Sequence, residues 1–396
     1  MRSILIFVPN YFPGYRSGGI ARTILNTVEW LGSDFEFFIV TRDRDLGSDK
    51  PYERIPRGVW VPMGASKVRY LAPDELTFHG LAQLVNDTKH DILHLNSFFD
   101  SVFTIKLLLL IRMRWINSPK IVMSPRGEFV EGPLNIKYKK KKIYILLSRI
   151  AGFYKGIKWH ASSSHESEGI VKALGVSSSA VYSAIDLPIK DSGSMSTEVP
   201  QGNELKIVFL SRLTREKNLD GALRILQLVR QPMQFDIVGP KEDIHYWREC
   251  EALIVQLPRH VKARYLGPIS PEDVFACLTK YDLFLFPTHG ENYGHVIAES
   301  ISVGTRVLIS QGTPWRNLVE DGVGWDLDVE DHAEFVKVLD DLAQQPYDER
   351  IALRDSVRRS ASMRLYNPEA LDHNRALYSW GIVDLTVNGQ AVPGFS

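Results

Sequence analysis

Two glutamates, Glu291 and Glu299, are the strongest candidates for chemistry in this sequence. They belong to the segment 286–300, in which an apolar strand ends, a glycine-containing loop follows and a helix is predicted to begin near Gly294. The unpaired amides and the dipole of a helix N-terminus bind anions, and glycines let a phosphate approach the backbone. The carboxylates would lie about 12 Å apart along such a helix. We expect them to hold hydroxyl groups at the two ends of a ligand that carries a diphosphate.

The simpler alternative is that Glu291 is a solvated loop residue and Glu299 a surface residue of the helix. The apolar neighbours Ile297, Ala298 and Ile301 argue against this alternative for Glu299. They predict a partly buried carboxylate, which requires a partner.

Two cations, Arg212 and Lys217, follow the predicted strand 207–210, and Asn218 is predicted to cap the helix after them. Arginine makes forked contacts to phosphate oxygens, and lysine adds a mobile charge. A solvated charged loop is the alternative interpretation, with Arg215 and Glu216 as its typical members.

The pair Gly18-Gly19 precedes a predicted helix at 20–31 and follows the first predicted strand, 4–8. Adjacent glycines at a helix start permit close approach of a ligand to the backbone. The segment is neither a dinucleotide-binding G-x-G-x-x-G motif nor a phosphate-binding P-loop, and no P-loop pattern occurs elsewhere.

Other polar residues give weaker signals. His94 and Arg126 follow predicted strands and are the N-terminal polar groups that we expect to face a ligand, whereas His160 and His165 are expected to satisfy local hydrogen bonds. No HExxH pair, Asp-x-Asp motif or Cys/His cluster occurs, so we predict no protein-bound metal and no cofactor other than the substrate.

A basic run precedes an apolar stretch that contains tyrosine. Such a run is typical either of a solvated helix face or of a surface that adsorbs to anionic lipid. No nucleic-acid-binding module accompanies it, so a nucleic-acid partner is not expected. The lysines concerned are Lys137, Lys139, Lys140, Lys141 and Lys142.

Composition is that of an ordinary globular protein. The 47 basic residues balance 47 acidic ones, and there are two cysteines, which predicts a reducing, cytoplasmic location. The N-terminal apolar run is too short for a signal peptide, and the apolar stretch 105–116 is interrupted by charges, so we expect no membrane span.

Short β-branched runs alternate with longer helical patterns along the chain, which predicts parallel sheets covered by helices on both faces. The polar, Ser/Gly-rich segment 191–203 is predicted to be a linker. We therefore expect two doubly wound α/β domains, 1–190 and 204–367, followed by a final helix and tail over 368–396. Ligands of such folds bind at the carboxyl ends of the strands.

These motifs together resemble glycosyltransferase family 4, the retaining group with the GT-B fold of two facing Rossmann-like domains. Gly18-Gly19 matches the glycine loop of that family, and Arg212 and Lys217 match its Gly-Arg-Leu…Lys segment, with Ser211 in place of the usual glycine. Glu291 and Glu299 match its paired-glutamate motif. The similarity extends over nearly the whole chain and is strongest over 205–330.

The resemblance implies roles for the matching residues. Arg212 and Lys217 would hold the diphosphate of a UDP- or GDP-sugar, with support from the amides around Gly294, His295 and Val296. Glu291 would bind the transferred sugar, and Glu299 the ribose. The C-terminal helix would cross back onto the N-terminal, acceptor-binding domain.

The same resemblance implies a metal-independent hexosyltransferase of bacterial polysaccharide or lipopolysaccharide assembly. Its acceptor would be a glycan or a lipid-linked sugar, and the enzyme would associate peripherally with the inner face of the plasma membrane. Two residues depart from the family pattern: Arg126 stands near the position of a common histidine, and His295 replaces an apolar residue.

Two other functions are consistent with this architecture. A nucleotide-sugar epimerase of GT-B fold would need acid/base carboxylates in the N-terminal domain, for which Glu128 and Asp100 are weak candidates. A non-catalytic binding protein is disfavoured, because Arg212, Lys217, Glu291 and Glu299 are all present.

Overall fold

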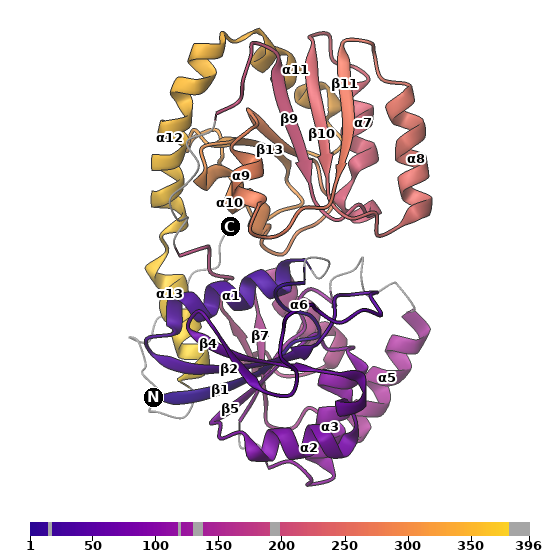
Figure 1. The fold of residues 1–396 in the computed structure, drawn as a ribbon, viewed down its shortest axis with the longest axis vertical. Helices are drawn as coiled ribbons and strands as arrows, with labels where there is room; N and C mark the ends of the chain where they lie inside the picture. Colours follow the sequence, from indigo (N-terminus) through magenta and orange to yellow (C-terminus); the bar gives the residue numbers. More distant parts are fainter. Residues whose placement is uncertain (15–17, 118–119, 130–137, 191–198, 380–396) are drawn as a thin grey trace.

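The computed structural model describes residues 1–14, 18–117, 120–129, 138–190 and 199–379. These residues form two α/β domains stacked along the long axis of the molecule (Figure 1). Each domain is built around its own sheet, so the predicted two-domain α/β architecture is confirmed.

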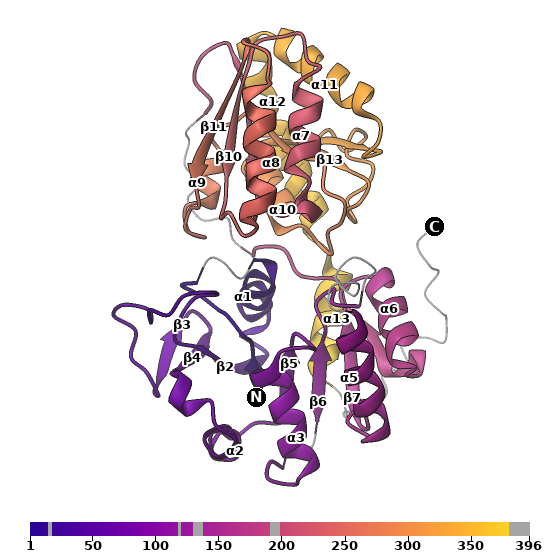
Figure 2. The ribbon, with the colours of Figure 1, turned by 90° about the vertical axis from the view of Figure 1, so that its right-hand side faces the viewer.

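The N-terminal domain contains, within the described residues, a sheet in the order β3-β4-β2-β1-β5-β6-β7-β8. Its helices lie on both faces of the sheet (Figure 2). The strands are β1 (Arg2–Phe7), β2 (Phe35–Arg42), β3 (Trp60–Met63), β4 (Ser66–Leu71), β5 (Ile92–Asn96), β6 (Ile121–Ser124), β7 (Ile157–Ala161) and β8 (Val181–Ser183). The helices are α1 (Gly19–Leu31), α2 (Phe78–Asp87), α3 (Leu107–Arg112), α5 (Tyr138–Ile150) and α6 (Ser164–Leu174).

One strand of this sheet departs from the expected parallel arrangement. β3 pairs with β4 antiparallel, with Met63 opposite Ser66. Only Gly64 and Ala65 connect these strands, and a parallel connection requires a crossover of a dozen residues or more. Gly64 has φ of 54°, which favours glycine in so tight a turn.

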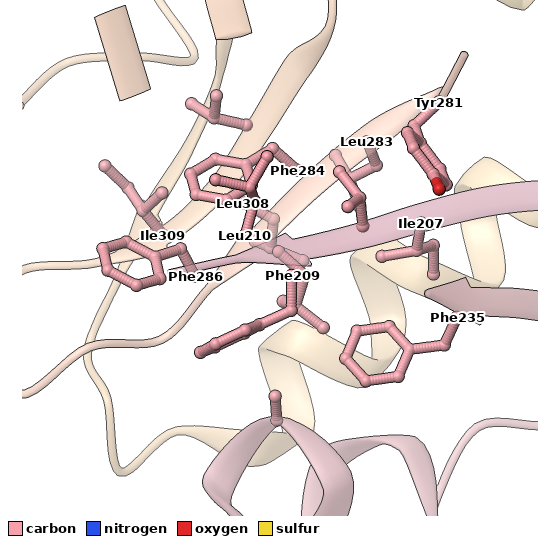
Figure 3. Packing of buried hydrophobic residues seen from close by; sticks show 14 of the residues in the cluster. Ile207, Phe209, Leu210, Phe235, Tyr281, Leu283, Phe284, Phe286, Leu308 and Ile309 are labelled. Carbon is pink, nitrogen blue, oxygen red and sulfur yellow. The ribbon is translucent and has the colours of Figure 1, made fainter. Parts of the chain in front are cut away.

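The C-terminal domain contains, in the part of the chain that is described, a parallel sheet in the order β11-β10-β9-β12-β13-β14. Aromatic side chains from adjacent strands, such as Phe209 and Phe286, fill its core (Figure 3). The strands are β9 (Leu205–Leu210), β10 (Met233–Val238), β11 (Val261–Gly267), β12 (Leu283–Phe286), β13 (Arg306–Ser310) and β14 (Gly324–Leu327). The helices are α7 (Leu219–Leu226), α8 (Ile244–Val255), α9 (Val274–Leu278), α10 (His295–Ser302), α11 (His332–Gln344) and α12 (Tyr347–Leu365).

The order of strands reverses beside the first strand of each domain, and ligands bind at such switch points. β1 lies between β2 and β5, and β9 lies between β10 and β12. The loop after β1 leads to Gly18, and the loop after β9 contains Arg212 and Lys217. The topology therefore places the predicted binding loops at both switch points.

The last described helix, α13 (Pro368–Tyr378), leaves the C-terminal domain and packs on the N-terminal one (Figure 1). The Tyr378 ring lies against Phe35 and Phe37, and Arg375 forms an ion pair of 2.9 Å with Asp34. Residues 380–396 of the predicted final helix and tail lie outside the described residues. None of the described helices is both long enough and apolar enough to traverse a bilayer.

Candidate active site

The loop after β9 carries two cations, Arg212 and Lys217. The guanidinium of Arg212 donates to both carboxylate oxygens of Glu242, at 2.9 and 3.2 Å, and about a third of its side chain is exposed. Lys217 closes a short 3-10 turn, Arg215–Lys217, and is buried. Asn218 adopts a left-handed conformation and accepts from the Gly221 amide, which confirms the predicted cap of α7.

Hydrogen bonds join this loop to the loop that follows β12. The Asn218 side chain donates to the carbonyl of Pro287 at 2.7 Å, and the carbonyl of Glu216 accepts from the His289 amide at 2.9 Å. These bonds are shorter than 3 Å and lie within one domain. The two loops therefore form one rigid support for the side chains they carry.

Lys217 and Glu291 meet on this support. Lys217 Nζ lies 2.8 Å from Glu291 Oε1 and 3.4 Å from the carbonyl of Gly290. The Glu291 side chain is 22% exposed, whereas that of Lys217 is 7% exposed. Because the lysine is buried and the glutamate reaches solvent, an incoming anionic ligand can exchange with the carboxylate at Nζ.

α10 begins beside this ion pair. Its N-cap is Gly294, with φ of 79°, and a Cβ there would come within 2.7 Å of the Ile297 side chain. The indole of Trp315 donates to the carbonyl of Tyr293 at 2.5 Å and fixes the preceding turn. Glycine is required at this position, and the first amides of α10, those of His295 and Val296, are the ones that we predict to bind an anion.

The N-terminal domain approaches this surface with its glycines. A Cβ on Gly18 would lie 3.2 Å from Arg212 Nε, and one on Gly19 would lie 3.5 Å from the His295 ring. Both predicted glycines thus lie against the predicted binding residues of the other domain. Gly127 makes a similar approach, since a Cβ there would lie 2.5 Å from the amide nitrogen of Asn292.

Glu299 is buried and ion-paired across the domain boundary. Its Oε1 lies 2.9 Å from Arg22 Nε on α1, and its residue is 4% exposed. Burial raises the pKa of Glu299, and the Arg22 charge opposes that rise. The predicted buried carboxylate with a partner is therefore present, and the partner comes from the other domain.

His295, one turn before Glu299, joins the same interface. Its Nε2 lies 2.8 Å from Thr23 Oγ1, which donates at 2.9 Å to Asp186. Arg126 Nη1 also contacts Asp186, at 3.1 Å. Burial lowers the pKa of His295 to about 4. The imidazole is therefore neutral at pH 7 and acts as a hydrogen-bonding contact between domains.

His94 does not face the ligand side as expected. Its Nδ1 lies 3.0 Å from the Tyr378 hydroxyl of α13, and its Nε2 lies 2.8 Å from Ser124 Oγ. Ser124 in turn contacts His160, which contacts the carbonyl of Ala184. His94 differs from the expectation because α13, remote in sequence, covers the position that His94 would otherwise present to solvent. His165 lies exposed on α6.

The two weak epimerase candidates have structural partners. The Glu128 carboxylate accepts from Ser97 Oγ at 2.6 Å and from the Phe99 amide at 3.0 Å, and burial raises its pKa. Asp100 accepts from the Val102 and Phe103 amides, where it caps a helical turn, and pairs with Arg42 at 2.9 Å. Both carboxylates are engaged in holding local structure.

The lysine run lies partly outside the described residues, which exclude Lys137 and the side chain of Lys139. Lys140 and Lys142 are exposed on α5, and the Lys141 ammonium lies over the Phe99 ring. An apolar stripe accompanies them at helical spacing. Its members, 57 to 76% exposed, are Ile143, Leu146, Leu147 and Ile150.

Sequence reasoning missed Arg22, Thr23 and Asp186, which complete the interface. Arg22 and Thr23 lie three and four positions after Gly19, so they share a helix face with a glycine already selected. That periodicity was an available signal. No sequence signal pointed to Asp186, because it lies in an irregular segment after a short strand.

Among the described residues, no group of three or more His, Cys, Asp or Glu side chains is placed to bind a metal.

Comparison with known proteins shows what the chain is similar to in sequence and in fold. Residues 195–360 match the family described as "Glycosyl transferases group 1". A protein of Klebsiella pneumoniae, described as an uncharacterized 41.2 kDa protein in the cps region, is 24% identical over 263 residues, or 64% of this chain and 69% of the relative.

Solved structures share the fold along 96% of the chain. They include Anabaena HepE in complex with UDP and glucose (TM-score 0.66, 14% identity, 99% of that chain covered). They also include WaaG, described as a glycosyltransferase involved in lipopolysaccharide biosynthesis (TM-score 0.62, 15% identity, 99% covered). The chain is thus similar to the group 1 glycosyltransferases over residues 195–360, and its fold over 96% of its length is that of the solved glycosyltransferase structures.

Proposed function

We propose that this protein transfers a hexose-type sugar, with retention of configuration, from a UDP- or GDP-sugar to a glycan or lipid-linked acceptor. The observation that carries the proposal is the buried Lys217 paired with Glu291 beside the N-terminus of α10. A cation, a hydroxyl acceptor and a phosphate-binding helix terminus are thereby gathered on one rigid support.

The diphosphate of the donor would bind between Lys217, Arg212 and the first amides of α10. In the structure the two cations are held by Glu291 and Glu242, which stand in for the anionic ligand. Phosphate oxygens would replace these carboxylates at Lys217 Nζ and at the Arg212 guanidinium. Two fixed cations supply charge that a metal ion would otherwise provide, so we propose a metal-independent enzyme.

The two glutamates would bind the hydroxyl groups on either side of the diphosphate. Glu291, released from Lys217, would accept from hydroxyls of the transferred sugar. Glu299, buried on α10, would accept from the ribose hydroxyls. Gly18 and Gly19 approach the same region without side chains and leave space for the donor.

Catalysis in this arrangement would consist mainly of positioning and charge neutralisation. The bond from the anomeric carbon to the leaving phosphate breaks while the acceptor oxygen attacks the same face of the sugar. The acceptor proton passes to the leaving phosphate oxygen. Lys217 and Arg212 stabilise the charge that develops on the departing diphosphate, which is the interaction that strengthens most in the transition state.

The biological setting is proposed from the relatives. One is encoded in a cps region, and a protein of the same fold is involved in lipopolysaccharide biosynthesis. We therefore assign this protein to cell-surface polysaccharide synthesis on the cytoplasmic side of the membrane. Because HepE was solved with UDP-glucose, we place UDP-hexoses first among the donors to test.

α5 supports a peripheral contact with anionic lipid. Its exposed apolar stripe, residues 143–150, lies next to exposed Lys140 and Lys142 on the same helix. A helix of this kind lies in the membrane interface, with apolar side chains inserted and lysines at the headgroups. A lipid-linked acceptor would be met at that surface.

The experiment is a screen of UDP- and GDP-hexoses for thermal stabilisation, followed by product analysis with and without oligosaccharide acceptors. Ligand binding raises the unfolding temperature by mass action. We expect one nucleotide series to stabilise the protein, and its sugar to appear on an acceptor with the anomeric configuration of the donor. Conversion of the nucleotide sugar to its epimer without acceptor would instead establish the epimerase alternative.

A further inference from the structure

The contact between α1 and α10 joins the two domains at one of the proposed donor-binding residues (Figures 1 and 2). We propose that Arg22 is a positioning residue for the donor. It holds the Glu299 carboxylate in place for the ribose hydroxyls and thereby makes ribose recognition depend on docking of the N-terminal domain. The inference rests on the proposed function, since it takes Glu299 as the ribose ligand.

Arg22 belongs to the N-terminal domain but contacts the C-terminal one twice. Its Nε lies 2.9 Å from Glu299 Oε1, and its Nη2 donates to the carbonyl of Pro271 at 3.2 Å. Its guanidinium also lies over the Phe12 ring, with 5.6 Å to the centroid. With 14% of the side chain exposed, the guanidinium is held in one orientation by partners on both sides of the boundary.

Glu299 can serve Arg22 and a ribose at the same time. A carboxylate accepts about four hydrogen bonds, so a guanidinium at Oε1 leaves capacity for two hydroxyl donors. The backbone of α10 around Glu299 is anchored because the flanking Ile297 and Ile301 are fully buried. The ion pair with Arg22 then fixes the direction of the carboxylate itself.

The neighbouring contacts make this arrangement depend on docking. Gly19 and Thr23 of α1 contact His295, one turn before Glu299 on α10. If the domains separate, Glu299 loses Arg22, the cation that fixes the direction of its carboxylate. Docking therefore prepares Glu299 for ribose, and by reciprocity a bound ribose favours docking.

The test compares a ribonucleotide with its 2′-deoxy form by titration calorimetry. UDP and GDP are titrated first, and the one that binds is then compared with 2′-deoxy-UDP or 2′-deoxy-GDP. For the wild type we expect the 2′-hydroxyl to strengthen binding at least about tenfold, as for a hydrogen bond to a charged group. In Arg22→Gln we expect that preference to fall to about twofold or less, with Arg22→Lys intermediate.

Arg42→Gln is the matched control. Arg42 also forms a 2.9 Å ion pair, lies over a phenylalanine ring and donates to a backbone carbonyl, but all its partners are in the N-terminal domain. The Arg42→Gln variant should keep the full preference for the ribonucleotide. Equal weakening of both nucleotides in Arg22→Gln would show a merely structural role and overturn the inference, as would an unchanged preference.

Glu299→Gln separates the inference from the proposed function. If Glu299→Gln retains the ribose preference, the assignment of Glu299 is wrong and the inference fails with it. If Glu299→Gln loses the preference but Arg22→Gln retains it, only the inference fails. Binding of neither UDP nor GDP to the wild type would contradict the proposed function itself.

Discussion

Glu291 and Glu299 lie eight positions apart, but their ion pairs differ in origin. Glu291 pairs with Lys217 of its own domain, on loops joined by hydrogen bonds, and is partly exposed. Glu299 is buried and pairs with Arg22 of the other domain. The end of the site around Glu291 and Lys217 is therefore complete within the C-terminal domain, and we call it the pre-formed end. The end around Glu299 is completed only when the domains meet, and we call it the shared end.

This difference suggests a division of tasks. The pre-formed end, with Lys217, suits the diphosphate, whose charge needs fixed cations. The shared end suits the ribose, if binding of the ribose is to depend on docking of the two domains. Substitutions at each end test whether the two ends are as different as their contacts indicate.

The largest effect is expected at the pre-formed end. Lys217→Ala and Glu291→Ala should each lower the rate of sugar transfer at least about 10²–10³-fold, the usual range for removing one preorganised transition-state contact. The measurement is product formation from the donor identified by the screen, with circular dichroism to verify folding.

Lys262→Ala is the control for this pair. Lys262 also forms a 3.0 Å ion pair with a glutamate of its own domain, Glu204, but its side chain is 64% exposed and lies at the edge of the sheet. The turnover of Lys262→Ala should stay within about twofold of the wild type, because a surface ion pair contributes little free energy. Near-normal turnover in Lys217→Ala and Glu291→Ala would show that the pre-formed end is not the donor site.

A smaller effect is expected at the shared end, where His295 should make the stability of the protein depend on pH. Its pKa is about 4 in the folded protein, below the ordinary value of 6.5, because of burial. The unfolded chain therefore binds more protons between these values, so stability is complete above pH 6.5 and is lost as the pH falls toward 4. The loss from His295 between pH 7 and pH 5 is about 2 kcal/mol.

The measurement is the free energy of unfolding of the wild type and of His295→Asn at pH 7 and pH 5. The variant should lose less stability on acidification, by about the same 2 kcal/mol. His94 and His160, whose pKa values are also lowered by burial, contribute equally to both proteins and cancel in the comparison. Identical pH dependence in the two proteins would contradict a buried neutral His295 at the interface.

The smallest effect is expected at the surface of α5, where each lysine near an anionic membrane contributes about 1 kcal/mol. The double variant Lys140→Glu/Lys142→Glu should weaken binding to vesicles with 30 mol% anionic lipid at least about tenfold in sedimentation, with no loss of donor affinity. The control is Lys337→Glu, on α11 of the other domain, where the lysine is also exposed; this variant should bind vesicles nearly as the wild type does. Unchanged vesicle binding in the double variant would refute the membrane contact.

Much of the pre-formed end could be predicted from the sequence, because its signals are local. The strand before Pro287, the glycine at the start of α10 and the Asn218 cap are all defined by residues within a few positions of each other. The antiparallel β3 was missed because its hairpin lies among weak apolar patterns.

The shared end could be predicted only in part. Apolar neighbours indicated that Glu299 needs a partner, but the partner, Arg22, lies 277 positions earlier and is brought there by domain docking. For the same reason His94 was placed toward the ligand, when α13 covers it. Contacts between distant segments depend on packing that no local pattern contains.

Hydrogen exchange with and without the nucleoside diphosphate tests the central claim most directly, because it reports where the ligand lies. We predict slower exchange in peptides that cover 287–304 and 211–218, with a smaller change in the first turns of α1. Protection confined to the N-terminal domain, with 287–304 unchanged, would contradict the account.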